Sequence, residues 1–312
     1  MHPALSIIFF TTASGAGYGL LVLIAWGALV GHLAPQASFG ICAFATALGL
    51  VGAGLLSSLG HLGHPERAWR ALTQWRTSWL SREGVMAILT FLPALAFAWS
   101  WIFAGEISKL AAALTIAGAI VTTICTAMIY ASLKPIRAWR NPWTVPVYLV
   151  LGFYSGALLT AVLLHAYGLR GPFITFLVVV VGLVGAALKL GYWRFLDHGA
   201  AASTAETATG LGSIGKVKML DPPHTESNYL LKEMGYRVAR KHAGTLRLVA
   251  LLFGFGLPIL LSLLATLGSP SVAIVCSLAA AVSGGIGMIV ERWLFFAEAK
   301  HTVTLYYGAS TA

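Results

Sequence analysis

Long apolar stretches, separated by short polar connections, dominate the chain. A helix of about 20 apolar residues crosses a hydrocarbon core of roughly 30 Å. Stretches of this length lie near residues 6–30, 37–59, 84–104, 110–133, 145–166, 172–193, 245–267 and 270–296. The pattern predicts an all-α, polytopic membrane protein of eight transmembrane helices in two packed four-helix groups. We expect residues 1–312 to form a single membrane domain, with one long loop at 194–244.

The composition agrees with a membrane protein. Of the 312 residues, 58% are hydrophobic and 10% are charged, and the mean hydropathy is +0.83. These values exclude an ordinary soluble domain of this length. The first span lacks a basic segment before it and an obvious cleavage site, so we expect it to be retained rather than removed as a signal peptide.

The basic residues are distributed unevenly over the connections. Those after the second, fourth and sixth spans carry most of them, whereas the opposite connections hold only Lys109 and Arg170. By the positive-inside rule, both termini and the basic loops are expected to face the cytoplasm. The net charge of +10 therefore reflects topology, and we expect no nucleic-acid partner.

The chain shows no groups for redox chemistry of its own. A b-type haem needs paired histidines inside helices, but nearly all of the histidines fall in loops, tails or helix ends. Cys42, Cys125 and Cys276 lie in separate spans, without the C-x-x-C spacing that holds zinc or an iron–sulfur cluster. We expect no haem, no cluster and no metal site, so any electrons must come from another subunit.

Titratable and aromatic groups crowd into residues 57–83, SSLGHLGHPERAWRALTQWRTSWLSRE. A quinone headgroup suits such a place, because its reduction takes two electrons and two protons, and His, Arg and carboxyl groups can donate hydrogen bonds or carry protons. His61 and Glu83 are expected to meet at the mouths of adjacent helices, with Arg67 beyond them. The alternative is an interfacial histidine beside a capping cluster of Arg82 and Glu83.

Two features inside the spans admit two interpretations each. Glu291 and Arg292 are adjacent near the end of the last span, where intramembrane charges are functional candidates, although snorkelling to the interface explains Arg292 equally well. Gly15, Gly17 and Gly19 would let a helix or a ligand approach the backbone closely. Close helix packing is the preferred explanation of these glycines.

Several stretches are similar to a known family: SIIFFTTASGAGYGLL, HLGHPERAWRAL followed by SWLSREG, MIYASLKPIRAWRNPW and GYRVARKHAGTLRLVAL. Together they resemble the DmsC-like anchor subunits of DMSO-reductase-type molybdoenzymes, within the wider NrfD-type anchors. The resemblance implies a cofactor-free subunit of the bacterial inner membrane that exchanges electrons with the quinone pool. It also implies two partners, a four-cluster ferredoxin-like iron–sulfur subunit and a molybdopterin catalytic subunit.

The same resemblance implies roles for three residues of a quinone site. His61 would donate a hydrogen bond to a quinone carbonyl, and Glu83 would relay protons. Arg67 would position the headgroup or stabilise its one-electron-reduced anion. The basic residues expected to dock the partner are Arg70, Arg76, Arg137, Arg140, Arg240 and Lys241.

One departure separates this chain from the DMSO reductase anchor. There the catalytic subunits lie in the periplasm, whereas the charge distribution here places the HLG loop in the cytoplasm. The LKPIRAWRNPW stretch is similar to the anchors (SoeC) of membrane-bound sulfite dehydrogenases, whose catalytic subunits are cytoplasmic. We therefore expect sulfite oxidation to sulfate with quinone reduction. An anchor of a DMSO-type or other reductase that oxidises quinol is the alternative.

Other functional classes remain open on the sequence. A polytopic anion transporter is disfavoured by the few charges in the hydrocarbon core and the lack of a visible internal repeat. A purely structural anchor would leave His61 and Glu83 replaceable without loss of turnover. A proton-translocating relative would need a polar path across the outer half, where the sequence offers little beyond Tyr130, Tyr154 and His165.

Overall fold

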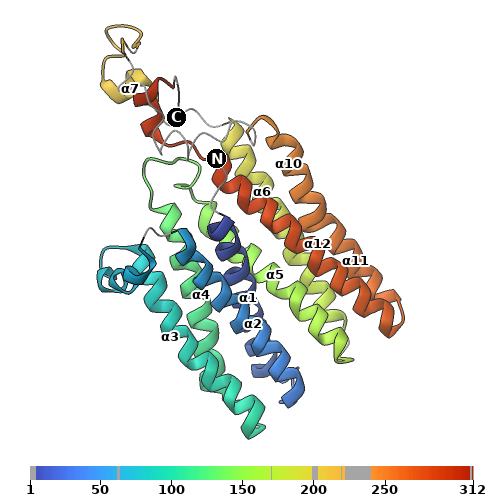
Figure 1. Ribbon diagram of the computed structural model, residues 1–312. Coiled ribbons are helices and arrows are strands. Elements are labelled where there is room, and N and C mark those ends of the chain that lie inside the picture. Colours follow the sequence, from blue (N-terminus) through green and yellow to red (C-terminus); the bar gives the residue numbers. More distant parts are fainter. Residues whose placement is uncertain are drawn as a thin grey trace.

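In the part of the chain that the structure describes, eight helical segments run side by side, each long and apolar enough to cross a membrane (Figure 1). This computed structural model describes residues 5–61, 64–169, 171–198, 203–218, 220–221, 240–309 and 311. Over these residues the chain forms helices and no sheet, with one isolated bridge between Thr204 and Thr311. The predicted all-α fold with eight membrane-spanning helices is confirmed.

The helices begin and end close to the predicted spans. The spanning segments are α1 (Leu5–Leu29), α2 (Ala37–Ser58), α3 (Trp79–Trp99) continued by η3 (Ser100–Ala104), α4 (Lys109–Ala131), α5 (Thr144–Ala166), α6 (Pro172–His198), α10 (Ala243–Leu251) continued by η4 (Leu252–Gly256) and α11 (Leu257–Leu267), and α12 (Pro270–Ala297). The short helices are η1 (Leu59–His61), η2 (Pro65–Gln74), α7 (Ala205–Thr209) and η5 (Thr302–Tyr307). The helices η3 and η4 are single π-helical turns.

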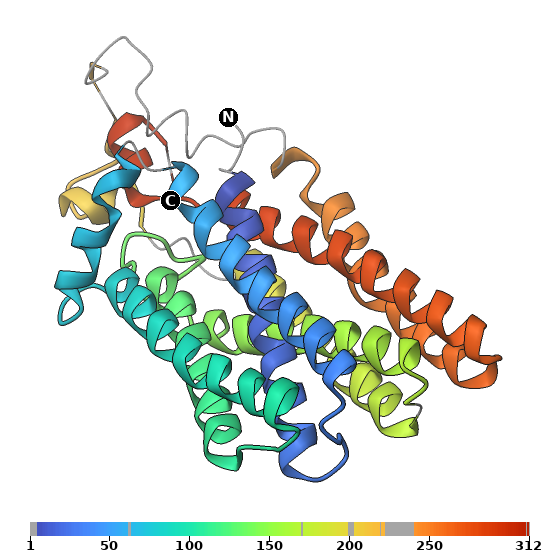
Figure 2. The ribbon, with the colours of Figure 1, turned by 60° about the horizontal axis from the view of Figure 1, so that its bottom comes forward.

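The spanning helices form two groups of four in chain order (Figures 1 and 2). The first group is α1 to α4, and the second is α5, α6, α10 with α11, and α12. Helix α1 packs on α2 and α4 within its own group and on α5 and α12 of the second, and α4 also packs on α5, so these contacts join the groups. The start of α1 and the end of α12 lie at one end of the bundle. We call this the basic end, because the arginine-bearing connections 59–78 and 132–143 lie there.

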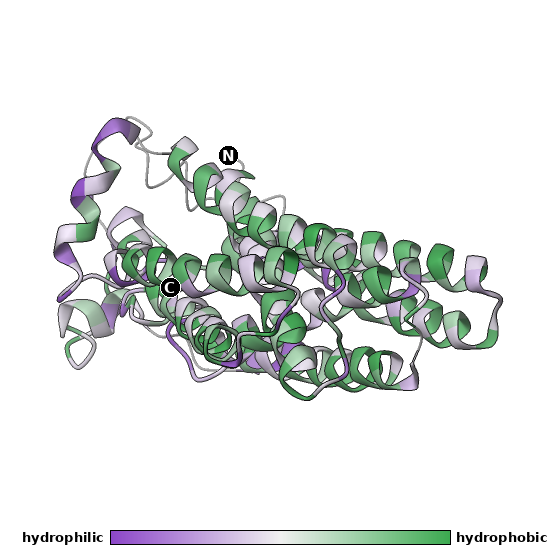
Figure 3. Ribbon diagram, turned by 90° about the horizontal axis from the view of Figure 1, so that it is seen from below, coloured by the Kyte–Doolittle hydropathy of each residue, from purple (hydrophilic) through white to green (hydrophobic). Residues whose placement is uncertain are grey.

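Apolar side chains cover the outside of the bundle. Hydrophobic residues run along the helices, and hydrophilic residues gather at the connections (Figure 3). Large apolar side chains such as Leu92 and Val275 are exposed along the helix lengths. A surface of this kind would drive a soluble protein to aggregate, and it fits contact with lipid.

Glycines let α1 approach its neighbours backbone to backbone. A Cβ atom on Gly19 would lie 2.2 Å from the carbonyl oxygen of Gly152 in α5, and one on Gly156 would lie 2.2 Å from the carbonyl carbon of Gly19. Gly17 points the other way, and its Cβ would lie 2.6 Å from the carbonyl oxygen of Ala47 in α2. Close helix packing therefore explains these glycines, as preferred from the sequence.

We expect Gly19→Ala to lower the free energy of unfolding by about 1–3 kcal/mol, because the added methyl group must force α1 and α5 apart. The measurement is the thermal denaturation midpoint in detergent. Gly49→Ala in α2 is the matched control, since a Cβ atom there meets nothing within 4 Å. If both variants melt with the wild type, the close contact between the helices is not present.

Candidate functional site

A buried carboxyl group lies about one turn into α3, near the basic end. Glu83 is 4% exposed, and it accepts a hydrogen bond from the hydroxyl of Thr126 in α4. Within the described part of the chain, no Lys or Arg forms an ion pair with Glu83. A carboxyl group shielded from water and held by one hydroxyl is a candidate for proton transfer.

The start of α3 turns two adjacent charged residues in opposite directions. Arg82 folds back on the preceding loop, donating to the carbonyl oxygens of Trp75 at 3.0 Å and Arg76 at 2.7 Å. Its guanidinium also lies 4.2 Å from the centre of the Trp79 ring. Arg82 is therefore a local capping charge, as the alternative interpretation proposed. The next residue, Glu83, points into the bundle instead, so that interpretation is wrong for Glu83.

The other two predicted quinone residues lie at the basic end. Arg67 is in η2, its side chain 59% exposed and its Nε atom 3.7 Å from the carboxylate of Glu66. The backbone of His61 ends η1, but its side chain lies outside the described part of the structure. The structure thus places Arg67 at the surface and Glu83 inside the helix bundle, and the two side chains are not in contact.

Hydroxyl groups continue inward from Glu83. The hydroxyl oxygens of Thr90 in α3 and Thr122 in α4 lie 3.0 Å apart. Tyr18 of α1 faces Thr122, and its buried hydroxyl has no well-formed hydrogen bond with any described residue. Because Tyr18 follows Leu5 by 13 residues, it lies about 20 Å along α1. A line of hydroxyls therefore leads from Glu83 toward the middle of the bundle.

A small polar cavity lies where the two helix groups meet. It has a volume of about 20 Å³ and is lined by α1, α4, α5 and α12, with room for roughly one or two water molecules. Tyr18, Tyr148 and Arg292 line it, and among the described residues the two tyrosine hydroxyls and the Nε and Nη1 atoms of Arg292 make no well-formed hydrogen bond. Thr126, the partner of Glu83, lines it as well. Unpaired buried polar groups cost free energy, so we expect ordered water here.

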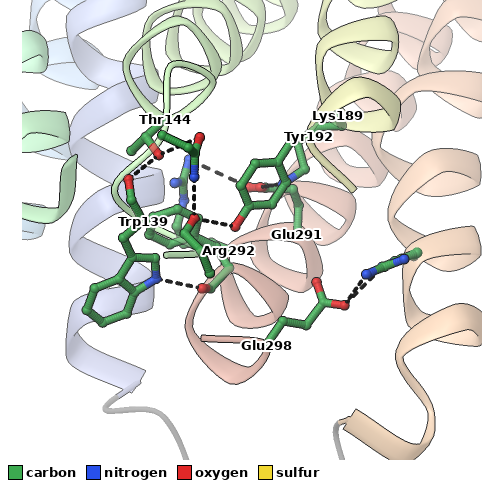
Figure 4. Close-up of polar contacts among 11 residues, drawn as sticks. Trp139, Thr144, Lys189, Tyr192, Glu291, Arg292 and Glu298 are labelled. Atoms are coloured by element: carbon green, nitrogen blue, oxygen red, sulfur yellow. Dashed lines mark hydrogen bonds and ion pairs between the residues drawn. The ribbon is translucent and has the colours of Figure 1, made fainter. Parts of the chain in front are cut away.

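Three charged residues meet inside the second helix group, beside this cavity (Figure 4). The Nζ atom of Lys189 in α6 lies 2.6 Å from one carboxylate oxygen of Glu291, and the Nη2 atom of Arg292 lies 3.6 Å from the other. Each of the three residues is at most 4% exposed. The guanidinium of Arg292 also lies 3.9 Å from the centre of the Tyr148 ring. The snorkelling interpretation of Arg292 is therefore wrong, because Glu291 and Tyr148 hold its charge inside the bundle.

Comparison with known proteins decides the family. A sequence profile described as "DMSO reductase anchor subunit (DmsC)" matches residues 1–297. The chain belongs to the DmsC family. The sulfite dehydrogenase subunit designated C in Allochromatium vinosum is 36% identical to it, over 98% of this chain and 99% of that protein. The polypeptide designated C of the anaerobic dimethyl sulfoxide reductase of Escherichia coli is 27% identical, over 59% of this chain and 67% of that protein.

The match confirms the resemblance inferred from the motifs, including the similarity to sulfite dehydrogenase anchors. It also favours an anchor over the anion transporter considered from the sequence. In this DmsC-family chain, no three His, Cys, Asp or Glu side chains gather as metal ligands among the residues that the structure describes.

The expected docking residues of this DmsC-family chain divide into two sets at the basic end. The exposed set is Arg70, Arg76, Arg140 and Lys241. The other two, Arg137 and Arg240, are half-buried and donate hydrogen bonds to carbonyl oxygens near the ends of helices. Arg137 donates to the carbonyl oxygen of Phe195 at 3.1 Å, and Arg240 donates to those of Ala297 and Ala299 at 3.0 and 2.9 Å. The exposed set is the better placed to meet a partner.

A surface ion cluster ties three helices of the second group together at the basic end. Arg247 of α10 lies 2.6 Å from carboxylate oxygens of both Asp197 in α6 and Glu298 after α12. Burial raises the pKa of Glu298, and the guanidinium of Arg247 opposes that shift. Because Arg247 has two carboxylate partners, the loss of either one leaves it paired.

Sequence reasoning missed Lys189, Tyr18, Tyr148 and Thr126. One signal could have revealed the ion pair. Lys189 lies nine residues before the end of α6, and Glu291 lies six before the end of α12, so both lie roughly 9–14 Å from the basic end. Opposite charges at a similar distance from the same end of the bundle, in two spans, predict an ion pair. Tyr130, which was expected in the outer half, lies in the last turn of α4 at the basic end.

Proposed function

We propose that this chain is the membrane anchor of a three-subunit molybdoenzyme and passes electrons between an iron–sulfur subunit and the quinone pool. The observation that carries the proposal is the 36% identity to a sulfite dehydrogenase subunit over 98% of the chain. That relative favours sulfite oxidation coupled to quinone reduction. The weaker similarity to a dimethyl sulfoxide reductase polypeptide keeps a quinol-oxidising reductase as the second candidate.

The reaction balances without any redox group in this chain. Sulfite and water give sulfate, two protons and two electrons, and a quinone takes up two electrons and two protons to become a quinol. In the proposed complex, electrons pass from a molybdopterin subunit through a four-cluster ferredoxin-like subunit docked on the basic end. The anchor binds the quinone and supplies its protons.

Glu83 is the proposed proton donor. Its carboxyl group is shielded from water, is held by Thr126 and lies near the end where a partner would dock. We assign His61 as a hydrogen-bond donor to a quinone carbonyl and Arg67 as the positive charge at the entrance of the site. General acid catalysis of this kind contributes about 10²–10⁴-fold to a rate.

The basic end is proposed to face the cytoplasm of the bacterial inner membrane. The support is the exposed set of basic residues at this end, whereas among the described residues the other end has Lys109. Electrons and protons would then come from the same side, so quinone reduction would be electrically neutral. A fluorescent reporter on the C-terminus should be active, whereas a periplasm-dependent phosphatase there should be inactive. The reverse pattern would overturn this orientation.

Arg70 and Arg76 are proposed to dock an acidic face of the iron–sulfur subunit. Each guanidinium lies 5.6 Å from the centre of an exposed tryptophan ring, Trp69 or Trp75, and Arg with Trp is typical of interface centres. We expect Arg70→Glu with Arg76→Glu to remove most co-purification of the partner at about 0.15 M salt.

The matched control for docking is Lys109→Glu, because Lys109 is exposed at the opposite end of the bundle. This variant should retain the partner at every salt concentration. Equal retention of the partner by the double variant and by the wild type would contradict the assignment of this surface.

The function is tested on the complex purified through a tag on this chain. Co-purification of molybdenum and iron–sulfur polypeptides, with sulfite-dependent quinone reduction, is the expected result. Quinol-dependent sulfoxide reduction without sulfite activity would favour the second candidate. Purification of this chain without either polypeptide would overturn the anchor role.

A further inference from the structure

An apolar groove runs along the lipid-facing side of α5, between α4 and α6. Its volume is about 380 Å³, within the range of roughly 300–1,000 Å³ that is typical of small-molecule sites. Ile120 of α4 and Val184 of α6 line it and are themselves exposed toward the lipid. Gly15, Gly19 and Gly152 also line it, where the backbones of α1 and α5 meet.

The groove meets the polar cavity at Tyr18 and Thr123. Both residues line the groove and the cavity, so they form the boundary between an apolar space and a polar one. Thr123 already donates its hydroxyl to the carbonyl oxygen of Ala119. Tyr18 is 3% exposed, and its hydroxyl faces Thr122 but makes no well-formed hydrogen bond with a described residue. Tyr18 thus offers a poorly satisfied donor at the polar boundary of an apolar groove.

We propose that this groove is the quinone-binding channel, with the isoprenoid tail between α4 and α6 and the ring against Tyr18, whose hydroxyl donates to a carbonyl oxygen. The inference rests on the proposed function and names the route and a contact residue for its substrate. It places the ring at Tyr18, deeper in the bundle than the contact with His61 that the family resemblance implies, and the photolabelling below decides between the two positions. A phospholipid acyl chain would also fill an apolar groove, but it would leave the Tyr18 hydroxyl unpaired, at a cost in free energy. A quinone joins an apolar tail to carbonyl acceptors and satisfies both surfaces.

This placement connects the quinone to Glu83. Thr126 donates to Glu83 and lines the same cavity as Tyr18. Water in that cavity would join Thr126 to the Tyr18 hydroxyl, so a proton can move from Glu83 to the ring without direct contact between them. Arg292 also lines the cavity and places a positive charge beside this path.

The test uses the purified complex and an azido-quinone photolabel. We expect labelled peptides that contain the groove-lining residues of α4, α5 and α6, which lie within 119–123, 149–153 and 181–184. Val184→Trp should block the groove and reduce labelling at least tenfold. Leu183→Trp is the matched control, because Leu183 is 58% exposed on the same helix and does not line the groove. Its labelling should match the wild type.

A second variant tests the contact with Tyr18. Tyr18→Phe removes one hydrogen bond and should raise the KM for quinone about tenfold, with a smaller change in kcat. Labels confined to residues 57–83, or equal labelling of Val184→Trp and the wild type, would overturn the channel. If the wild-type complex still reduced quinone, the proposed function would stand. Absence of quinone turnover in the wild-type complex would overturn both.

Discussion

We expect Glu83→Gln to lower quinone reduction by the assembled complex at least about 100-fold, while sulfite oxidation with an artificial electron acceptor is unchanged. The amide has the size of the carboxyl group and can still accept the hydrogen bond from Thr126. It cannot release or take up a proton at physiological pH. The variant therefore separates proton transfer from folding and from partner docking. The measurement is the ratio of the two activities in one preparation.

Glu106→Gln is the matched control, because Glu106 is an exposed glutamate after η3, at the opposite end of the bundle from the basic end. It should keep both activities. Glu83→Asp should retain part of the quinone activity, since it keeps a carboxyl group and shifts its position. Full quinone activity in Glu83→Gln would mean that the buried carboxyl group is structural and that the protons follow another path.

A second large effect is expected from Glu291→Gln, on stability. Lys189 and Arg292 share the carboxylate of Glu291 inside the bundle, and all three side chains are at most 4% exposed. Removal of that charge leaves two buried basic groups without a counter-ion, which costs about 3–5 kcal/mol. The expected result is a lower yield of assembled protein and a clearly lower thermal denaturation midpoint in detergent.

Two further variants test the origin of that loss. Glu298→Gln should have a much smaller effect, because Arg247 keeps Asp197 as a partner. Lys189→Met combined with Glu291→Gln should recover part of the lost stability, since the closest unpaired basic group is then gone. A midpoint for Glu291→Gln equal to that of the wild type would show that the carboxylate does not stabilise the two basic groups.

The sequence predicted the membrane architecture because the signal for each span is local. About 20 apolar residues in a row decide a span without knowledge of the rest of the chain. The small residues at Gly17 and Gly19 likewise predicted close helix contacts. The sequence could not show that Gly19 meets α5 while Gly17 meets α2, since neighbouring positions on a helix face different directions.

The polar interior was harder to predict because its contacts join distant residues. Lys189 and Glu291 lie about 100 residues apart in the sequence, and the periodicity of a single span says nothing about its partner. The serines and threonines around the cavity are common in membrane helices, where they bond to their own backbone. Only the packing of α1, α4, α5 and α12 shows that Thr126 and Tyr18 line a cavity with Arg292.

The structure also changes the view of Glu83. The sequence suggested a residue at the helix mouth, in contact with His61, with Arg67 beyond them. The structure buries Glu83 beside hydroxyl groups that lead toward the junction of the two helix groups. A partner on the basic end and a quinone entering from the lipid would thus approach this carboxyl group from different sides.

The most direct test of the anchor role compares sulfite-driven quinone reduction by the complete complex with that of the catalytic and iron–sulfur subunits alone, in vesicles that contain the native quinone. The proposed function predicts that the subunits alone oxidise sulfite with an artificial acceptor but leave the membrane quinone oxidised, and that addition of this chain restores quinone reduction. Equal rates of quinone reduction with and without this chain would contradict it.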